Sequence, residues 1–186
     1  KYFASDSSIQ LISNSNSIQP GDELLVGVKF RLEKGWHTYW KNPGDAGEEA
    51  MIKWNLSKGL SASNILWPGP ERIPVDPLMT FGYNDEVVLL TKIASDEKVN
   101  FPLKIEAKVS WFTCKDICIP QEGTVDIEIN EGNLLATSHD QELKEYLSKV
   151  PTVFSKDFRV EALDNKFFFQ SDVLGDEQYT DVYFFP

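Results

Sequence analysis

Cys114 and Cys118 are the residues of this chain best suited to chemistry, because they are its only cysteines and three residues separate them. Four residues of extended strand span about 13 Å, whereas a disulfide needs its Cα atoms roughly 4.4–6.8 Å apart. The Lys-Asp-Ile segment between the cysteines must therefore turn back sharply if the two sulfurs bond. A close pair of thiols could exchange with disulfides or bind a soft metal ion.

A purely structural disulfide is the plain alternative. On the chain-entropy model, a loop this short stabilises the fold by roughly 2 kcal/mol, against roughly 4 kcal/mol for a bridge that spans half a domain. The spacing therefore favours chemistry over a structural staple. Thiol–disulfide exchange needs two cysteines close together, one of them within reach of a partner, and it needs no metal or organic cofactor.

Two alternating segments are expected to position the cysteines. Apolar and polar residues alternate over 103–111, which leads to Cys114, and over 125–129, which follows Cys118. A period of two is typical of an antiparallel strand with one buried face. The cysteine pair is therefore predicted between two neighbouring strands, at the end of a sheet.

Further strands are predicted from the same pattern. Leu24 to Leu32 alternates after a Pro-Gly-Asp turn and places Lys29 on its second face. Residues 86–93 make a further apolar strand, and 9–12 and 51–56 are shorter candidates. Many short strands with Gly and Pro between them predict an all-β fold, an immunoglobulin-like antiparallel β-sandwich. One short helix and a C-terminal partial β element complete this prediction.

The helix is expected over residues 138–149. Ser138 to Gln141 has the spacing of a capping box, apolar residues follow at helical intervals, and Pro151 ends the segment. After it, alternation predicts strands at 158–162, 166–169 and 181–186.

This pattern predicts three parts. They are an immunoglobulin-like redox domain over residues 1–135, a connecting helix over 136–152, and a tail over 153–186. A lone hairpin is marginal in water, so the tail either packs on the first domain or is the start of a second, truncated β domain, and we predict the second domain.

Composition excludes one class of partner. The chain has 18 basic and 29 acidic residues and a formal net charge of −11. It therefore has no positive field for a phosphate backbone, so nucleic acid is not an expected partner. No apolar run approaches the roughly 20 residues that a membrane-spanning helix needs.

Three segments resemble one family, and they occur in the matching order. They are Gly35-Trp-His-Thr-Tyr-Trp-Lys-Asn-Pro-Gly-Asp-Ala-Gly47, Pro77-Leu-Met-Thr-Phe-Gly-Tyr83 and Trp111-Phe-Thr-Cys-Lys-Asp-Ile-Cys-Ile-Pro120. Together they resemble the N-terminal periplasmic domain of the DsbD and ScsB type of transmembrane thiol:disulfide interchange proteins. The resemblance covers roughly residues 1–135. The final Tyr183-Phe-Phe-Pro186 is also similar to the start of the second β domain in longer ScsB-like members.

The resemblance implies a protein-disulfide reductase domain without a cofactor. In that family, electrons from cytoplasmic thioredoxin cross the membrane-embedded domain of the same parent chain and reach a thioredoxin-like periplasmic domain. That domain reduces the N-terminal domain, which then reduces oxidised periplasmic client proteins. The implied location is the periplasm, as the soluble part of an inner-membrane protein.

The resemblance also implies roles for individual residues. Cys114 and Cys118 would be the redox pair, with Cys118 forming the mixed disulfide and Cys114 resolving it. Phe81 would cap the pair, and Trp36 and Tyr39 would help to shield it. The chain has three residues between its cysteines where the best-known members have five, which leaves the turn geometry and the identity of the cap residue open.

A copper-binding chaperone is the alternative from another class. The Cys-x₃-Cys spacing followed by Pro120 is also similar to the copper chaperones of the Sco family, in which two thiolates and one His hold the metal. His37 and His139 are the only histidines available as a third ligand. Those chaperones have a thioredoxin fold of alternating strands and helices, a pattern that this sequence does not show.

Overall fold

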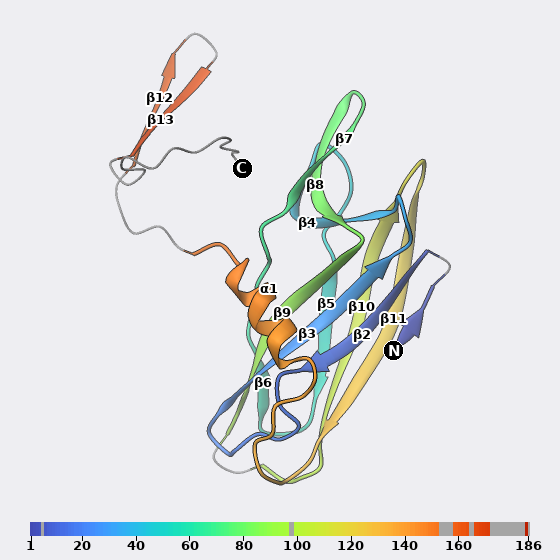
Figure 1. The fold of residues 1–186 in the computed structure, drawn as a ribbon, viewed down its shortest axis with the longest axis vertical. Helices are drawn as coiled ribbons and strands as arrows, with labels where there is room; N and C mark the ends of the chain where they lie inside the picture. The colour runs from blue at the N-terminus through green and yellow to red at the C-terminus, as the bar shows by residue number, and fades with distance from the viewer. Residues whose placement is uncertain (5, 97–98, 153–157, 164–165, 172–184, 186) are drawn as a thin grey trace. The chain divides into compact units, whose positions relative to one another are not determined.

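Antiparallel strands form two sheets in the first part of the chain (Figure 1). One sheet runs in the order β1 (Tyr2–Phe3), β2 (Ser7–Ser13), β3 (Glu23–Leu32), β9 (Glu86–Ser95) and β6 (Leu60–Ala62). The other runs β11 (Cys118–Ile129), β10 (Leu103–Cys114), β4 (His37–Gly44), β8 (Leu78–Asn84) and β7 (Glu71–Val75), and β5 (Met51–Leu56) also pairs with β10. This arrangement confirms the predicted immunoglobulin-like sandwich.

The structure is a computed structural model that describes residues 1–4, 6–96, 99–152, 158–163, 166–171 and 185. The chain divides into two units, Lys1–Pro151 and Thr152–Pro186. No helix among the described residues is long and apolar enough to cross a membrane.

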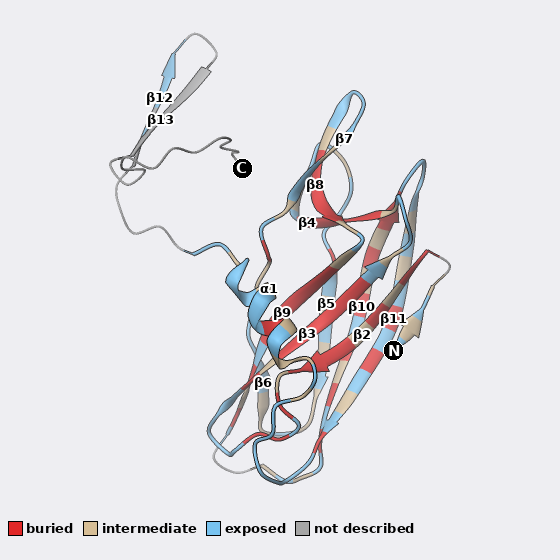
Figure 2. Ribbon diagram, in the orientation of Figure 1, coloured by how far each residue is buried: buried red, intermediate tan, exposed pale blue. Residues whose placement is uncertain are grey.

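The core lies between the two sheets of the first unit. Alternate residues of β3 point into it, and Val26, Val28 and Phe30 are fully buried there. Phe30 meets Trp111 of β10 edge to face, with ring centroids 5.7 Å apart. Figure 2 shows buried residues along β2, β3 and β9 and along parts of β4 and β8. Along β10, buried residues alternate with more exposed ones. Burial on this scale gives the cysteine-bearing strand a rigid base.

Helix α1 (Asp140–Ser148) covers the outer face of β3 and β9. Its Leu143 is fully buried, in a cluster with Ile12 and Val88. Gly27 makes room for this helix, because a Cβ at that position would lie 2.8 Å from Leu143 Cδ2. The helix therefore packs against the first unit through a specific apolar contact.

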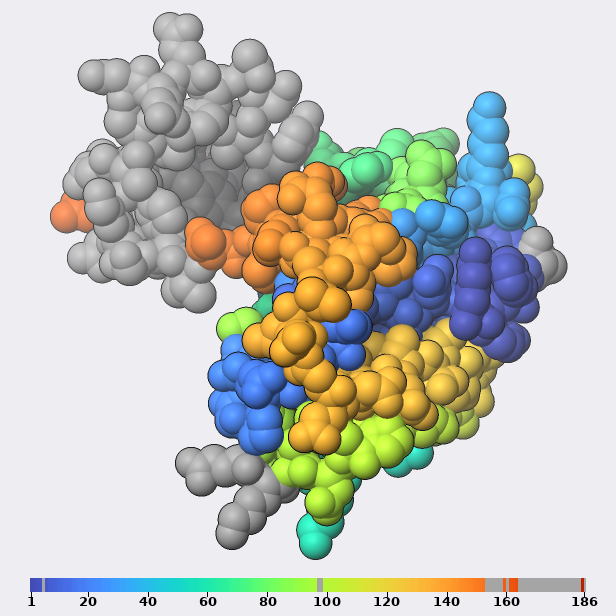
Figure 3. All heavy atoms as spheres, turned by 60° about the horizontal axis from the view of Figure 1, so that its bottom comes forward, coloured from blue at the N-terminus to red at the C-terminus, as the bar shows by residue number. Residues whose placement is uncertain are grey.

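The segment before the helix is also attached to the sandwich. The amide of Asn16 donates to the carbonyl of Leu135, and the amide of Thr137 donates to the carbonyl of Asn14. Figure 3 shows this segment lying against the N-terminal strands. The predicted capping box is wrong, since His139 is the N-cap and no side chain caps the helix.

Lys29 departs from what alternation alone would suggest. It lies on the outer face of β3, as expected, but its side chain is only 6% exposed because α1 covers that face. Its ammonium group contacts Glu142 of the helix and lies 3.1 Å from Glu86 of β9. This ion cluster joins the helix to the sheet.

The second unit contains a hairpin of β12 (Phe158–Leu163) and β13 (Lys166–Ser171). These strands match the predicted segments 158–162 and 166–169. The strand predicted over 181–186 lies outside the described residues, apart from position 185. The assignment of 153–186 to a second β domain stays a prediction.

Candidate functional site

The cysteines lie at the tip of the β10–β11 hairpin. The two strands pair residue by residue from Leu103 with Ile129 to Cys114 with Cys118. The intervening segment turns back, and the amide of Lys115 donates to the carbonyl of Ile117. Cys114 and Cys118 form a disulfide with their Cα atoms 4.1 Å apart. The sharp turn expected from the spacing is therefore present.

The two cysteines differ in exposure. Cys114 is only 2% exposed, whereas Cys118 is exposed, and its neighbour Ile117 is 67% exposed. A partner thiolate needs access to the sulfur that it attacks. An incoming partner can therefore reach Cys118 but not Cys114, and it meets an apolar side chain beside the accessible sulfur.

Strand β4 brings two polar rings to the disulfide. His37 is the Cα partner of Cys114, and the hydroxyl of Tyr39 lies 3.3 Å from Cys118 Sγ. The His37 and Tyr39 rings meet edge to face at 5.3 Å. Burial raises the pKa of the Tyr39 phenol and lowers the pKa of the His37 imidazole. Both groups are therefore neutral near pH 7, and Tyr39 can donate its O–H to sulfur.

The Gly-Asp-Ala-Gly motif begins at the last residue of β4 and ends at Gly47, where the structure requires a glycine. The φ of Gly47 is +100°, in the region that favours glycine, and a Cβ there would lie 2.3 Å from Cζ of Tyr39. The backbone at Gly47 therefore lies directly against the Tyr39 ring. Only a residue without a side chain leaves the phenol in contact with Cys118.

A buried carboxylate supports the cysteine end of the hairpin. Asp6 is 3% exposed and accepts hydrogen bonds from the Thr113 hydroxyl and, at 2.9 Å, from Gln121 Nε2. Thr113 precedes the first cysteine and Gln121 lies in the strand that follows the second. The carboxylate thus holds both strands of the hairpin. Sequence patterns did not indicate Asp6, because it lies 107 residues before Thr113 and belongs to no motif.

The three predicted shielding residues occupy different positions. Tyr39 contacts Cys118 directly, and Trp36 is half-buried just before β4. Phe81 is buried in β8, where the neighbouring Gly82 is the residue paired with Tyr39. Since side chains alternate along a strand, Phe81 lies on the face of β8 opposite to the one that Gly82 shares with Tyr39. The role of Phe81 as a cap stays a prediction.

Replacing Phe81 with Ala is the test of that cap. If Phe81 shields the pair, the reduced variant should react about tenfold faster with a small aromatic disulfide, because access controls the exchange rate. The rate is measured by stopped-flow absorbance, after circular dichroism has established that the variant is folded. Phe3→Ala, at a side chain that is 69% exposed, is the control and should leave the rate unchanged. Equal rates for the Phe81 variant and the unmodified protein would contradict the cap.

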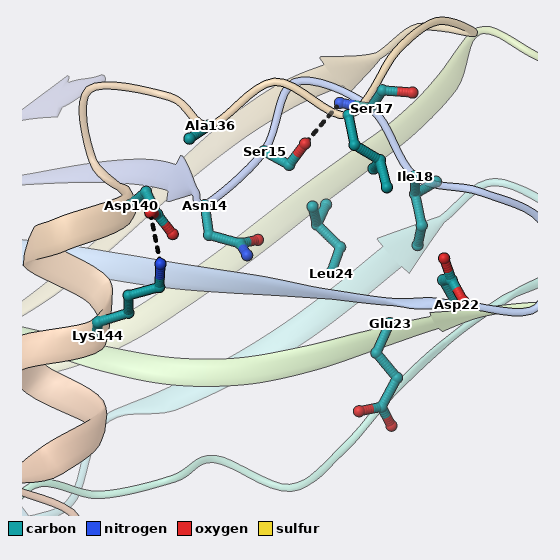
Figure 4. Close-up of a pocket in the computed structure, with 11 residues that line it drawn as sticks. Asn14, Ser15, Ser17, Ile18, Asp22, Glu23, Leu24, Ala136, Asp140 and Lys144 are labelled. Atoms are coloured by element: carbon teal, nitrogen blue, oxygen red, sulfur yellow. Dashed lines mark hydrogen bonds and ion pairs between the residues drawn. The ribbon is translucent and has the colours of Figure 1, made fainter.

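One cavity of the described residues lies away from the cysteines. A cavity of about 430 Å³ between the β2–β3 connection and α1 includes Asn14, Asp22 and Asp140 in its lining, but no cysteine (Figure 4). Its Lys144 is already 2.7 Å from Asp140. Among the described residues, no group of three or more His, Cys, Asp and Glu side chains is placed to hold a metal ion. His139 lies before α1 and contacts Glu142.

Comparison with known proteins agrees with the sequence resemblance. The family described as "Thiol:disulfide interchange protein DsbD, N-terminal" matches residues 10–128. No curated protein matches the chain.

Two solved structures are also similar. The N-terminal periplasmic domain of ScsB from Proteus mirabilis is 21% identical, with a TM-score of 0.61 over 86% of this chain and 59% of that one. The DsbD N-terminal domain of Neisseria meningitidis in the reduced form is 15% identical, with a TM-score of 0.33 over 68% of this chain and 89% of that one. The ScsB likeness establishes the fold, and the present chain spans 59% of the length of that domain.

Proposed function

The chain belongs to the family of DsbD N-terminal domains, and from this premise we propose that it is a periplasmic protein-disulfide reductase domain. Thiol–disulfide exchange is the chemistry of this family, and the disulfide of Cys114 and Cys118 supplies the reacting pair. In the proposed route, a thioredoxin-like periplasmic domain, itself reduced by a membrane-embedded domain of the same parent chain, reduces the pair. The pair then reduces oxidised periplasmic client proteins.

One observation carries this proposal beyond the family assignment. The disulfide lies at a hairpin tip with one sulfur exposed and the other buried. Exchange proceeds by attack on one sulfur, a mixed disulfide, and resolution by the second thiol. An accessible Cys118 and a sheltered Cys114 suit these two steps, because the partner meets one sulfur and the second thiol is kept from side reactions.

The reduction cycle balances without a cofactor. The Cys118 thiolate attacks a client disulfide, and one client sulfur leaves as a thiolate and takes up a proton. Cys114 then attacks Cys118 Sγ, the bond between Cys118 and the client breaks, and the second client thiolate leaves. Two electrons pass from the pair to the client, and the Cys114–Cys118 disulfide forms again.

Counting thiols during exchange with a reduced thioredoxin-like protein tests the proposal. We expect no reactive thiols in the oxidised chain and two after exchange, with an unchanged circular dichroism spectrum. A variant with both cysteines replaced by Ser is the control and should oxidise none of the partner. A disulfide that the partner reduces only after the chain is unfolded would identify a structural staple instead.

The copper-chaperone alternative receives no support from the fold. The described residues form an antiparallel sandwich rather than the alternating strands and helices of a thioredoxin fold. Titrating the reduced chain with Cu(I) alongside the exchange measurement compares copper binding with disulfide exchange in one preparation.

A further inference from the structure

His37 is a buried ionisable residue beside the redox pair that the exchange steps described above do not use. Its side chain is 5% exposed, and within the described part of the chain its Nε2 is buried without a hydrogen-bond partner. A buried polar atom in this condition destabilises the fold, because it has lost its hydrogen bonds to water without gaining others. Such an atom calls for an explanation, and a redox or catalytic role is one of those that apply in native structures.

The register of the sheet places Cys114 beside His37. His37 and Cys114 are directly paired across β4 and β10, so their side chains project from the same face as immediate neighbours. In the disulfide form Cys114 carries no hydrogen. In the reduced form its S–H is a donor, and a neutral imidazole nitrogen is an acceptor. The group that would complete His37 therefore exists only when the disulfide is reduced.

Because Cys114 is buried, its thiol cannot readily lose its proton to water. Cys114 is 2% exposed, yet a thiolate is the species that attacks a disulfide. Tyr39 is the nearest other ionisable side chain in β4, but it contacts Cys118, and burial raises the pKa of its phenol. His37 is the neighbouring group of Cys114 that can accept a proton near neutral pH.

We propose that His37 is the general base for Cys114 in the resolving step. This inference rests on the proposed function and adds a residue to its mechanism. His37 Nε2 takes the proton of the Cys114 thiol, and the resulting thiolate attacks Cys118 Sγ in the mixed disulfide. The Cys114–Cys118 bond forms, the bond from Cys118 to the client sulfur breaks, and that sulfur leaves as a thiolate. The imidazolium then returns its proton to the leaving thiolate or to water.

Reaction of the fully reduced protein with an excess of a small aromatic disulfide separates the two chemical steps. The first release of aromatic thiolate reports attack by Cys118, and the second reports resolution by Cys114. His37→Gln is expected to slow the second phase about 100-fold, the lower end of the usual contribution of a general base, and to change the first phase less than twofold. His139→Gln replaces the other histidine and is the matched control, with both phases unchanged.

The pH dependence of the unmodified protein gives a readout that does not require the variant. With His37 as the base, the second phase should level off above the pKa of the imidazole, which burial places below its usual 6.5. Without a base, the rate should keep rising tenfold per pH unit through this range, because it follows the fraction of thiolate. The other charged or titratable groups near this position are Tyr39 in β4, Lys115 in the hairpin, and Glu71, which accepts from Asn84, the β8 partner of His37.

Three results would overturn the assignment. They are an unchanged second phase in a folded His37→Gln variant, equal slowing of both phases, and a second phase of the unmodified protein that keeps rising tenfold per pH unit above the pKa of the imidazole. The probe is a small molecule, so these results do not depend on any protein partner. Failure to exchange with a thioredoxin-like protein would contradict the proposed function while leaving this measurement in place.

Discussion

Replacing Cys118 with Ala is expected to abolish the covalent complex with a thioredoxin-like partner whose own resolving cysteine has been removed and whose remaining thiol has been activated as a mixed disulfide with a small aromatic thiol, which leaves as a thiolate when the chain attacks. The exposed Cys118 is the sulfur that the partner can reach, whereas Cys114 is 2% exposed. Replacing Cys114 with Ala should have the opposite effect, because the mixed disulfide then has no second thiol to resolve it. Non-reducing electrophoresis should show nearly complete conversion for the Cys114 variant and no complex for the Cys118 variant.

Two checks make this result decisive. Each variant must give the circular dichroism spectrum of the unmodified protein, so that a missing complex does not reflect unfolding. Adding dithiothreitol must release the partner, which establishes that the bond is a disulfide. A complex with the Cys118 variant but not with the Cys114 variant would reverse the roles, and no complex with either folded variant would contradict the exchange function.

Replacing Glu142 with Ala is expected to destabilise the first unit by about 3 kcal/mol. Lys29 is 6% exposed and contacts Glu142, so the variant leaves a buried ammonium group with less compensation. We take the lower end of the usual range because Glu86 still lies 3.1 Å from Lys29. Urea unfolding of the oxidised protein, followed by tryptophan fluorescence, measures the change as a lower midpoint.

Glu145 provides the matched control on the same helix. It is exposed, so Glu145→Ala should change the free energy of unfolding by about 0.5 kcal/mol or less. Equal effects of the two substitutions would show that helix propensity rather than the ion cluster is responsible. Replacing Lys29 with Met and Glu142 with Leu together should recover most of the lost stability, since an apolar pair needs no compensating charge.

The pH dependence of the Glu142 effect follows from the direction of its pKa shift. Burial alone would raise the pKa of this carboxyl, but hydrogen bonds from Lys29 and His139 lower it below its usual 4.5. A carboxyl with a lowered pKa in the folded state contributes stability above its unfolded pKa and loses it as the pH falls through the folded value. The difference between Glu142→Ala and the unmodified protein should therefore be constant near pH 7 and shrink below about pH 4.5.

Local patterning was enough to predict the elements that carry the site. The alternation before Cys114 and after Cys118 predicts β10 and β11, and the short spacing predicts a turn between them. The sequence shows these strands because apolar and polar residues alternate along any strand with one buried face, whatever its neighbours are. The three ordered motifs also indicated the family, which the match over residues 10–128 establishes.

The environment of the disulfide depends instead on sheet order and register. His37 pairs with Cys114, Tyr39 contacts Cys118, and Asp6 accepts from Thr113. The residues of each pair lie 77 to 107 positions apart in the sequence. Alternation cannot distinguish a polar face in water from one covered by another element, and so Lys29 gave no sign of its burial under α1. The accessibility of Cys118 and the burial of Cys114 have the same origin, because the packing of distant strands decides which of two adjacent sulfurs meets the solvent.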